Sequence, residues 1–306
     1  MVEVLEGFTA LAALIALGAL LAHVGFLTYA SQTMLVRLAF WVASPALLLT
    51  VVADADVHAV FSANLVATAG AVAGSLLLYL LLSRLVARRP APETVIGSLC
   101  AMYVNAGNLG LPIAAYVLED AALVAPVLLL QLIVLQPLAL AVLDRTTAGE
   151  AAGVGRLVLR TVRNPLMLGA VLGLVLALTG IQLPTVVRSP VDLLGAMAVP
   201  AMLLAYGVSL RLGPKPGGGS PPGELALVVA LKLLVQPALA YLIGLAVGLQ
   251  DTALYAVAVL AALPTAQNVF VLASRYDRAV VLARDAIFLS TIGAVPVILG
   301  ITALLA

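Results

Sequence analysis

Long apolar runs separated by short polar connectors dominate the pattern along the chain. A helix needs about 20 apolar residues to cross the hydrocarbon core of a bilayer, and charges or Pro/Gly clusters mark where each run ends. We therefore expect an all-α polytopic membrane protein. The pattern predicts ten transmembrane helices, at about 5–26, 35–53, 63–83, 95–118, 121–143, 164–182, 190–210, 224–248, 252–274 and 286–305.

Composition supports this fold class. Of the 306 residues, 64% are hydrophobic and 9% are charged, whereas roughly 25% of residues are charged in soluble proteins. A soluble globular protein is therefore excluded. The net charge of +1 and the absence of a basic block give nucleic acid no electrostatic footprint, so we expect no nucleic-acid partner. Cys100 is the single cysteine, which excludes a disulfide framework within the chain.

Basic residues are distributed unequally between the two sets of connectors, which predicts the orientation. One set holds thirteen of the fifteen Lys and Arg residues, whereas the other holds Arg188 alone. Cytosolic loops are enriched in Lys and Arg, so we expect a cell (cytoplasmic) membrane protein with both termini outside. Glu3 and Glu6 precede the first run, where a signal peptide would have a basic start, so this run is taken as the first span.

Prolines recur in the same order in the two halves of the chain. The pairs are Pro45 with Pro200, Pro112 with Pro264, and Pro137 with Pro296, and the first pair shares a Pro-Ala-x-Leu-Leu string. Each half holds five spans, an odd number, so a second copy would enter the membrane inverted. We predict a first repeat at 1–145, a cytosolic linker at 146–163 and an inverted repeat at 164–306. The alternative is that prolines are simply common in membrane helices.

The fourth and ninth spans carry the polar residues that point to a site. Polar residues at this depth are functional candidates by default. Proline and glycine weaken a helix, and a break inside a membrane survives only where protein shields it or where it lines a wet cavity. Both spans should therefore break at their prolines. The candidate residues are Asn105, Gly107, Asn108 and Pro112 in the fourth span, and Pro264, Gln267 and Asn268 in the ninth.

These two breaks predict an anion site. The fourth and ninth spans run in opposite directions, so two half-helix N-termini would approach the midplane with free N–H groups. Such ends attract anions. Lys232, the eighth candidate residue, lies about eight residues into the eighth span, or roughly 12 Å deep. Two interpretations of Lys232 are open: a role toward substrate or structural carbonyls, or snorkelling to the headgroups.

Other chemistry lacks the residues it needs. His23 and His58 lie far apart without acidic neighbours, so no metal site is expected. The chain has no nucleophile elbow, P-loop or paired carboxylates, so we expect neither an enzyme nor a cofactor. No Asp or Glu lies mid-span, and Asp192 is near the outer end of the seventh span. Because hard cations prefer carboxylate ligands, sodium coupling is not favoured.

Several strings resemble the auxin efflux carrier family, which includes the plant PIN-FORMED carriers and bacterial transporters of malate or malonate. The resemblance implies ten helices in two inverted five-helix repeats, similar to bile acid/sodium symporters and sodium/proton antiporters. It also implies that helices 4 and 9 are broken and cross, that helices 3–5 and 8–10 move against a scaffold of helices 1, 2, 6 and 7, and that the protein is commonly a dimer. The strings are Asn105-Ala-Gly-Asn-Leu-Gly-Leu-Pro112, Pro45-Ala-Leu-Leu-Leu49, Asn164-Pro165, Lys232-Leu-Leu-Val-Gln-Pro237, and Ala262-Leu-Pro264 followed by Phe270-Val-Leu-Ala-Ser-Arg-Tyr276.

The sequence therefore predicts a secondary transporter of small organic anions, auxin-like or dicarboxylates such as malate or malonate. The substrate would bind at the crossing of helices 4 and 9, with elevator-type alternating access. Expected partners are the anion, the lipid bilayer and, from the resemblance, a second copy of the chain in a homodimer. The alternatives are a cation or proton exchanger, or a channel or sensor with a transporter-like fold.

Overall fold

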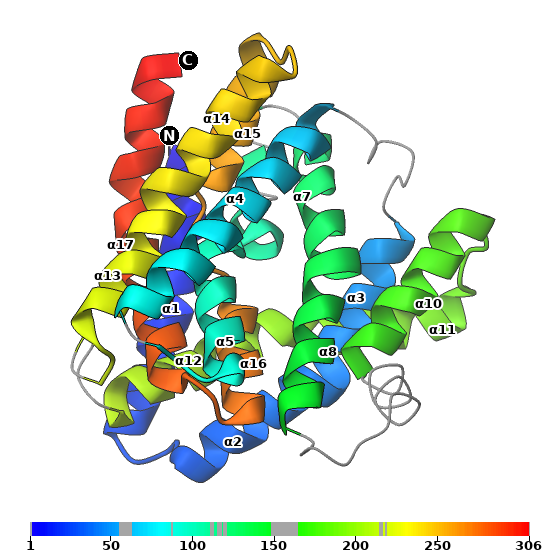
Figure 1. Ribbon diagram of the computed structural model, residues 1–306. Coiled ribbons are helices and arrows are strands. Elements are labelled where there is room, and N and C mark those ends of the chain that lie inside the picture. Colours follow the sequence, from blue (N-terminus) through cyan, green and yellow to red (C-terminus); the bar gives the residue numbers. More distant parts are fainter. Residues whose placement is uncertain are drawn as a thin grey trace.

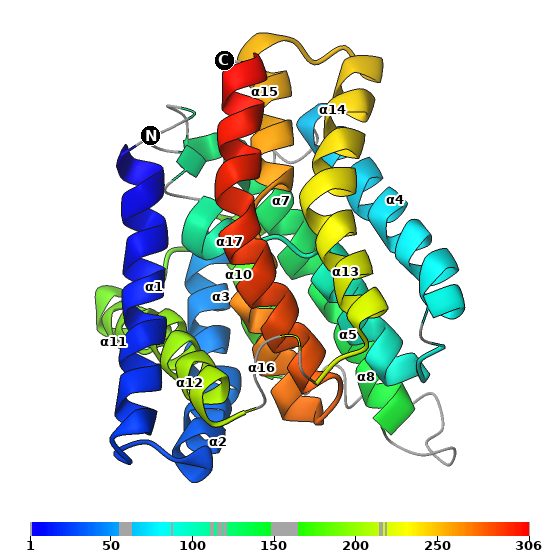
Figure 2. The same ribbon diagram turned by 90° about the vertical axis from the view of Figure 1, so that its left-hand side faces the viewer.

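A computed structural model describes residues 2–54, 63–86, 88–110, 113–114, 118, 121–147, 165–213, 217 and 219–305. Apart from connecting segments, these residues are helical, with a single isolated antiparallel bridge between Val104 and Thr265. The long helices form one bundle, in which α1 (Val2–His23) begins and α17 (Val280–Leu305) ends at the same end (Figures 1 and 2).

Helix occupies part of each of the ten predicted ranges. Among the described residues, six continuous helical stretches are long and apolar enough to cross a membrane, at 29–53, 63–85, 126–146, 185–212, 222–246 and 280–305. An all-helical, polytopic membrane protein is therefore confirmed. Between α1 and α17 the elements are α2 (Tyr29–Leu38), η1 (Ala39–Ala43), α3 (Ser44–Ala53), α4 (Ala63–Val86), α5 (Ala91–Met102), η3 (Ala106–Gly110), η4 (Ala121–Val124), α7 (Ala125–Leu129), η5 (Leu130–Leu135), α8 (Gln136–Thr147), α10 (Pro165–Thr179), α11 (Thr185–Ala196), α12 (Ala198–Leu212), α13 (Pro222–Ala230), η6 (Leu231–Val235), α14 (Gln236–Ala246), α15 (Asp251–Ala261) and α16 (Gln267–Tyr276).

Three of the long helices change to a wider π-helical turn shortly before a proline. η1 precedes Pro45, η5 precedes Pro137 and η6 precedes Pro237. A proline donates no backbone hydrogen bond and its ring clashes with the carbonyl four residues earlier, so the preceding turn widens instead of breaking. Wide turns of this kind often occur at functional sites, and two of these three adjoin the site described below.

One group of helices packs with its backbones in close contact. α1 packs on α12, α12 on α2, and α3 on both α10 and α11, which lie together beside α3 (Figure 1). A Cβ atom added at Gly207 of α12 would lie 2.1 Å from the carbonyl oxygen of Ile15, and one at Gly169 of α10 would lie 2.3 Å from that of Pro45. Small residues permit this close approach of membrane helices.

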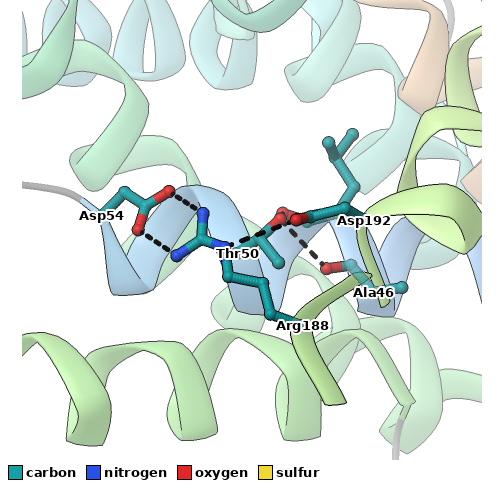
Figure 3. A network of polar contacts seen from close by, with 6 residues as sticks. Ala46, Thr50, Asp54, Arg188 and Asp192 are labelled. Atoms are coloured by element: carbon teal, nitrogen blue, oxygen red, sulfur yellow. Dashed lines mark hydrogen bonds and ion pairs between the residues drawn. The ribbon is translucent and has the colours of Figure 1, made fainter. Parts of the chain in front are cut away.

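Arg188 of α11 links α11 to the end of α3 (Figure 3). Its Nη1 and Nη2 atoms donate to the two carboxylate oxygens of Asp54, at 2.9 and 2.6 Å, and its Nε atom lies 3.4 Å from Asp192. The two hydrogen bonds hold the pKa of the Asp54 carboxyl below its ordinary value. Because the groups are exposed, the contribution of this ion pair to stability is small.

The remaining helices form a second group. α4 packs on α14, α5 on α13 and α4, and α17 on α15 and α16. Buried Arg284 of α17 joins this group to the first, because it donates to the carbonyl of Ser209 in α12 at 3.3 Å. It also forms an ion pair with Asp285 of its own helix at 2.6 Å. Tyr206 of α12 donates to the carbonyl of Arg284 at 2.6 Å. The predicted linker at 146–163 lies outside the described residues except at its first two positions.

Candidate functional site

Two extended segments cross at the centre of the site. α5 ends at Met102 and α15 ends at Ala261, and the chain that follows each helix is not helical. The N–H of Asn105 donates to the carbonyl of Pro264 at 2.8 Å, and the N–H of Ala266 donates to that of Tyr103 at 3.1 Å. This antiparallel pairing gives backbone groups the partners that a helix would have supplied, as a buried break requires. Helix is therefore interrupted after both Met102 and Ala261.

The position of the first break differs from the prediction. The break comes at Tyr103–Asn105, before Pro112, and helix resumes in η3 at Ala106. The carbonyl of Asn105 accepts hydrogen bonds from the N–H groups of Leu109 and Gly110, at 3.2 and 3.1 Å. The first turn of η3 is therefore hydrogen-bonded to Asn105, the last residue of the break. Pairing with the second segment, rather than the proline, therefore sets the break. Pro112 itself lies outside the described residues.

The second break matches its prediction more closely. Pro264 lies within the extended segment, and α16 begins three residues later at Gln267. Its N-cap residue, Ala266, has extended backbone and makes no side-chain cap. The first N–H groups of a helix have no partners within the helix and carry partial positive charge. This end of α16 faces the cavity described below, because Ala266, Gln267 and Asn268 line it.

Lys232 and Gln236 lie behind the crossing, at the C-terminal ends of the two half-helices. The Nζ atom of Lys232 donates to the carbonyl of Ala261 and to Oε1 of Gln236, both at 2.7 Å. The amide of Gln236 in turn donates to the carbonyl of Met102 at 2.9 Å. A lysine is favourable where helix C-termini carry partial negative charge. Lys232 is fully buried, so snorkelling is excluded, and its partners fit the structural-carbonyl role.

A cavity of about 110 Å³ lies against the crossing. Its described lining residues carry no formal charge. Gly107 is one of them, and a Cβ atom there would meet nothing within 4 Å. The other polar lining residues are Ser44, Tyr103, Asn105, Gln131, Gln136, Gln267 and Asn268, and the apolar ones include Leu47, Leu48, Leu128, Leu132, Leu166 and Met202.

The side-chain N–H₂ groups of Asn105 and Gln131, two residues that line this cavity, are buried without partners among the described residues. Asn105 and Gln131 are each 2% exposed, and neither the Nδ2 atom of Asn105 nor the Nε2 atom of Gln131 has a hydrogen-bond partner. An unsatisfied buried polar group costs about 1–3 kcal/mol. Gln136, by contrast, accepts a hydrogen bond from Tyr103 at 3.0 Å. The two free N–H₂ groups are therefore donors available to an acceptor in the cavity.

The predicted site residues separate into three sets. Asn105, Gly107, Gln267 and Asn268 are brought together around the cavity. Pro264 lies in the crossing but not in the lining, and Lys232 lies behind it, so neither contacts the cavity. The side chain of Asn108 and the whole of Pro112 lie outside the described residues.

The sequence analysis missed three glutamines. Gln131 and Gln136 line the cavity, and Gln236 binds the end of α5. A signal was present, because Gln136-Pro137 and Gln236-Pro237 are the same dipeptide, each inside an apolar run. Both dipeptides directly follow a π-helical turn, and those turns carry Gln131 and Lys232.

The chain is similar in sequence to known membrane transport proteins. The model of the family described as "Membrane transport protein" matches residues 4–302. A protein of Rhizobium meliloti (strain 1021) named "Putative malonate transporter" is 32% identical over 152 residues, which is 49% of this chain and 46% of that protein. The chain thus matches about half the length of this relative.

Proposed function

The chain belongs to the membrane transport protein family, that of the auxin efflux carriers, and on that premise we propose that it is a secondary transporter of small organic anions. The observation that carries the proposal is the uncharged cavity at the crossing, with its two unpaired amide donors. A carboxylate only accepts hydrogen bonds, so it matches amide donors and the N-terminus of α16. A small dicarboxylate, with malonate as the first compound to test, fits this donor set and the name of the relative.

The proposed architecture has ten spans in two inverted repeats, with both termini outside. Helix in each of the ten predicted ranges supports the count. The two chain ends lie at one end of the bundle (Figures 1 and 2), as an even number of crossings requires. The two interrupted spans, α5 with η3 and α15 with α16, are the fourth of the first half and the fourth of the second. The excess of Lys and Arg in one set of connectors supports the orientation.

The proposed transport cycle is of the elevator type. Helices α1–α3 and α10–α12 form the scaffold, and the group that holds the crossing moves against it. The cavity lies between the two, since Ser44 and Met202 come from the first group and Asn105 and Gln267 from the second. The contacts of Arg284 and Tyr206 between the groups would break in the opposite state.

Counterflow of radiolabelled malonate in proteoliposomes tests the function. A transporter preloaded with unlabelled malonate accumulates the label transiently, because the two faces of the carrier exchange substrate. A channel would equilibrate the label without overshoot, and a sensor would bind it without flux. A cation exchanger would show sodium- or pH-driven flux that needs no organic anion. Absence of an overshoot with malonate, malate and auxin-like acids alike would contradict the proposal.

A further inference from the structure

A second cavity lies away from the crossing, between the first group of helices and α16. It measures about 370 Å³ and is lined by residues of α2, η1 and α16, which lie close together at one end of the bundle (Figures 1 and 2). The excess of basic residues assigns this end to the cytosol. The lining residues are Gln32, Thr33, Val36, Arg37, Trp41, Ser274 and Arg275.

No described carboxylate neutralises the two arginines of this cavity. In the part of the chain that the structure describes, neither Arg37 nor Arg275 forms an ion pair with a carboxylate. This contrasts with Arg188 and Arg284, which both bind aspartates. Two guanidinium groups at one cavity create a local positive electrostatic potential, which raises the local concentration of anions.

The guanidinium of Arg275 lies over aromatic rings and not beside a described carboxylate. Its central carbon lies 5.4 Å from the ring centroid of Trp41 and 5.5 Å from that of Phe40. The attraction between a cation and a ring face does not use the N–H groups of the guanidinium, which stay free to donate. On the same wall, the hydroxyl of Ser274 is inaccessible to solvent and has no hydrogen-bond partner.

We propose that this cavity is an oxyanion site, which binds a carboxylate or phosphate group between Arg37 and Arg275. Guanidinium groups bind such oxyanions with paired, charge-assisted hydrogen bonds. A free anion in solution and the phosphate of a lipid headgroup share this chemistry. Because the lining comes from both groups of helices, an occupied site stabilises the present arrangement of α16 against α2. The site does not depend on the proposed transport function.

The chain contains one tryptophan, and it lines this cavity. Binding to Arg275 changes the field at the Trp41 ring, so tryptophan fluorescence of the full-length protein reports occupancy directly. In detergent, the protein is titrated with malonate and with inorganic phosphate, using chloride at equal ionic strength as the reference. In a second arm, the fraction of anionic phosphatidylglycerol in phosphatidylcholine nanodiscs is raised stepwise. Trp41→Phe should abolish the signal.

We expect a saturable fluorescence change. A response in detergent assigns the site to free anions, and a response in phosphatidylglycerol nanodiscs alone assigns it to a headgroup phosphate; both uphold the oxyanion site. Arg37→Gln and Arg275→Gln should each weaken binding at least about tenfold. Arg278→Gln, an exposed arginine outside the cavity, should change nothing. Circular dichroism checks that the variants remain folded.

Gln131→Leu separates this site from the one at the crossing. It should leave the fluorescence titration unchanged whether or not it impairs transport. Three outcomes would overturn the proposal: no saturable response in either arm, wild-type titrations for both arginine variants, or loss of the response in Gln131→Leu.

Discussion

The backbone N–H of Asn105 donates to the carbonyl oxygen of Pro264 at 2.8 Å, which joins two residues from opposite halves of the chain. The same residue lines the adjacent cavity, and its buried amide Nδ2 atom has no partner among the described residues. The backbone of Asn105 therefore holds the crossing together while its side chain remains free to bind a ligand. Asn105 therefore belongs both to the backbone pairing and to the proposed binding site.

Leucine in place of Asn105 or Gln131 should reduce anion uptake at low malonate concentration without weakening the fold. A hydrogen bond to a charged group contributes about 1.5–3 kcal/mol, so each variant should lose roughly ten- to a hundredfold in affinity for malonate. Stability should stay unchanged or rise, because each change removes an unsatisfied buried donor. Uptake in proteoliposomes and thermal unfolding measure the two effects.

Ser75→Ala is the matched control for these variants. Ser75 is fully buried, and its Oγ atom also lacks a partner, but it does not line the cavity. It should transport like the wild type. Equal loss of uptake in Ser75→Ala, or normal uptake in both leucine variants, would show that the cavity amides do not select the substrate.

Lys232→Met should destabilise the protein by about 2–3 kcal/mol. The methionine leaves the carbonyl of Ala261 without its buried donor and removes a hydrogen bond to Gln236, and hydrogen bonds from charged groups lie in this range. The fraction of the Lys232→Met protein that folds should bind malonate with the affinity of the wild type. A normal unfolding temperature together with lost malonate binding would instead place Lys232 at the substrate.

Gly207→Ala and Gly300→Ala form a contrasting pair. The new Cβ at position 207 would lie 2.1 Å from the Ile15 carbonyl, so α1 and α12 must separate, at a cost of about 1–3 kcal/mol. At position 300 of α17 nothing lies within 4 Å, and alanine favours helix by about 1 kcal/mol over glycine. Thermal unfolding in detergent should therefore rank Gly300→Ala above the wild type and Gly207→Ala below it. The reverse order would argue against the close packing of α1 on α12.

The Asp54–Arg188 pair predicts a small, pH-dependent contribution to stability. Hydrogen bonding to Arg188 lowers the pKa of the Asp54 carboxyl from its ordinary value of 3.8. A carboxyl whose pKa is lower in the folded state stabilises the fold above its unfolded pKa, and that stabilisation is lost as the pH falls through the folded pKa. The wild type should therefore unfold at a higher temperature than Asp54→Asn at neutral pH. The difference should vanish well below pH 3.8; a difference that persists there would exclude the ion pair as its cause.

The sequence was informative about the fold because membrane helices depend on local composition. Apolar length and the polar stretches around Asn105 and Gln267 were enough to predict the helical class and the two interrupted spans. The position of the first break was not predictable from Pro112, because pairing between Val104 and Thr265 sets it. That pairing joins distant parts of the chain and leaves no local signal.

The same limit applies to the side chains of the site. The position of Lys232 in the eighth span predicts its depth in the membrane. Its hydrogen bond to the carbonyl of Ala261 is not predictable in this way, because it depends on how α15 packs against η6. Gln131 and Gln136 resembled ordinary polar residues within an apolar run. Their position at the cavity follows from the packing of η5 and α8 beside the crossing.

Substrate protection of a cysteine introduced by Gly107→Cys tests the central claim most directly. Gly107 lines the cavity, and a Cβ there meets nothing within 4 Å, so this variant should fold and transport. Cys100→Ala removes the native thiol and keeps the backbone carbonyl that Thr265 binds. Gln250→Cys, at an exposed position before α15, is the control.

Malonate should slow alkylation of the Gly107→Cys variant saturably, with half-protection near the KM for uptake, and leave alkylation of the Gln250→Cys variant unaffected. Alkylation of the Gly107→Cys variant at an unchanged rate, in protein that still takes up malonate, would contradict a substrate site at the crossing.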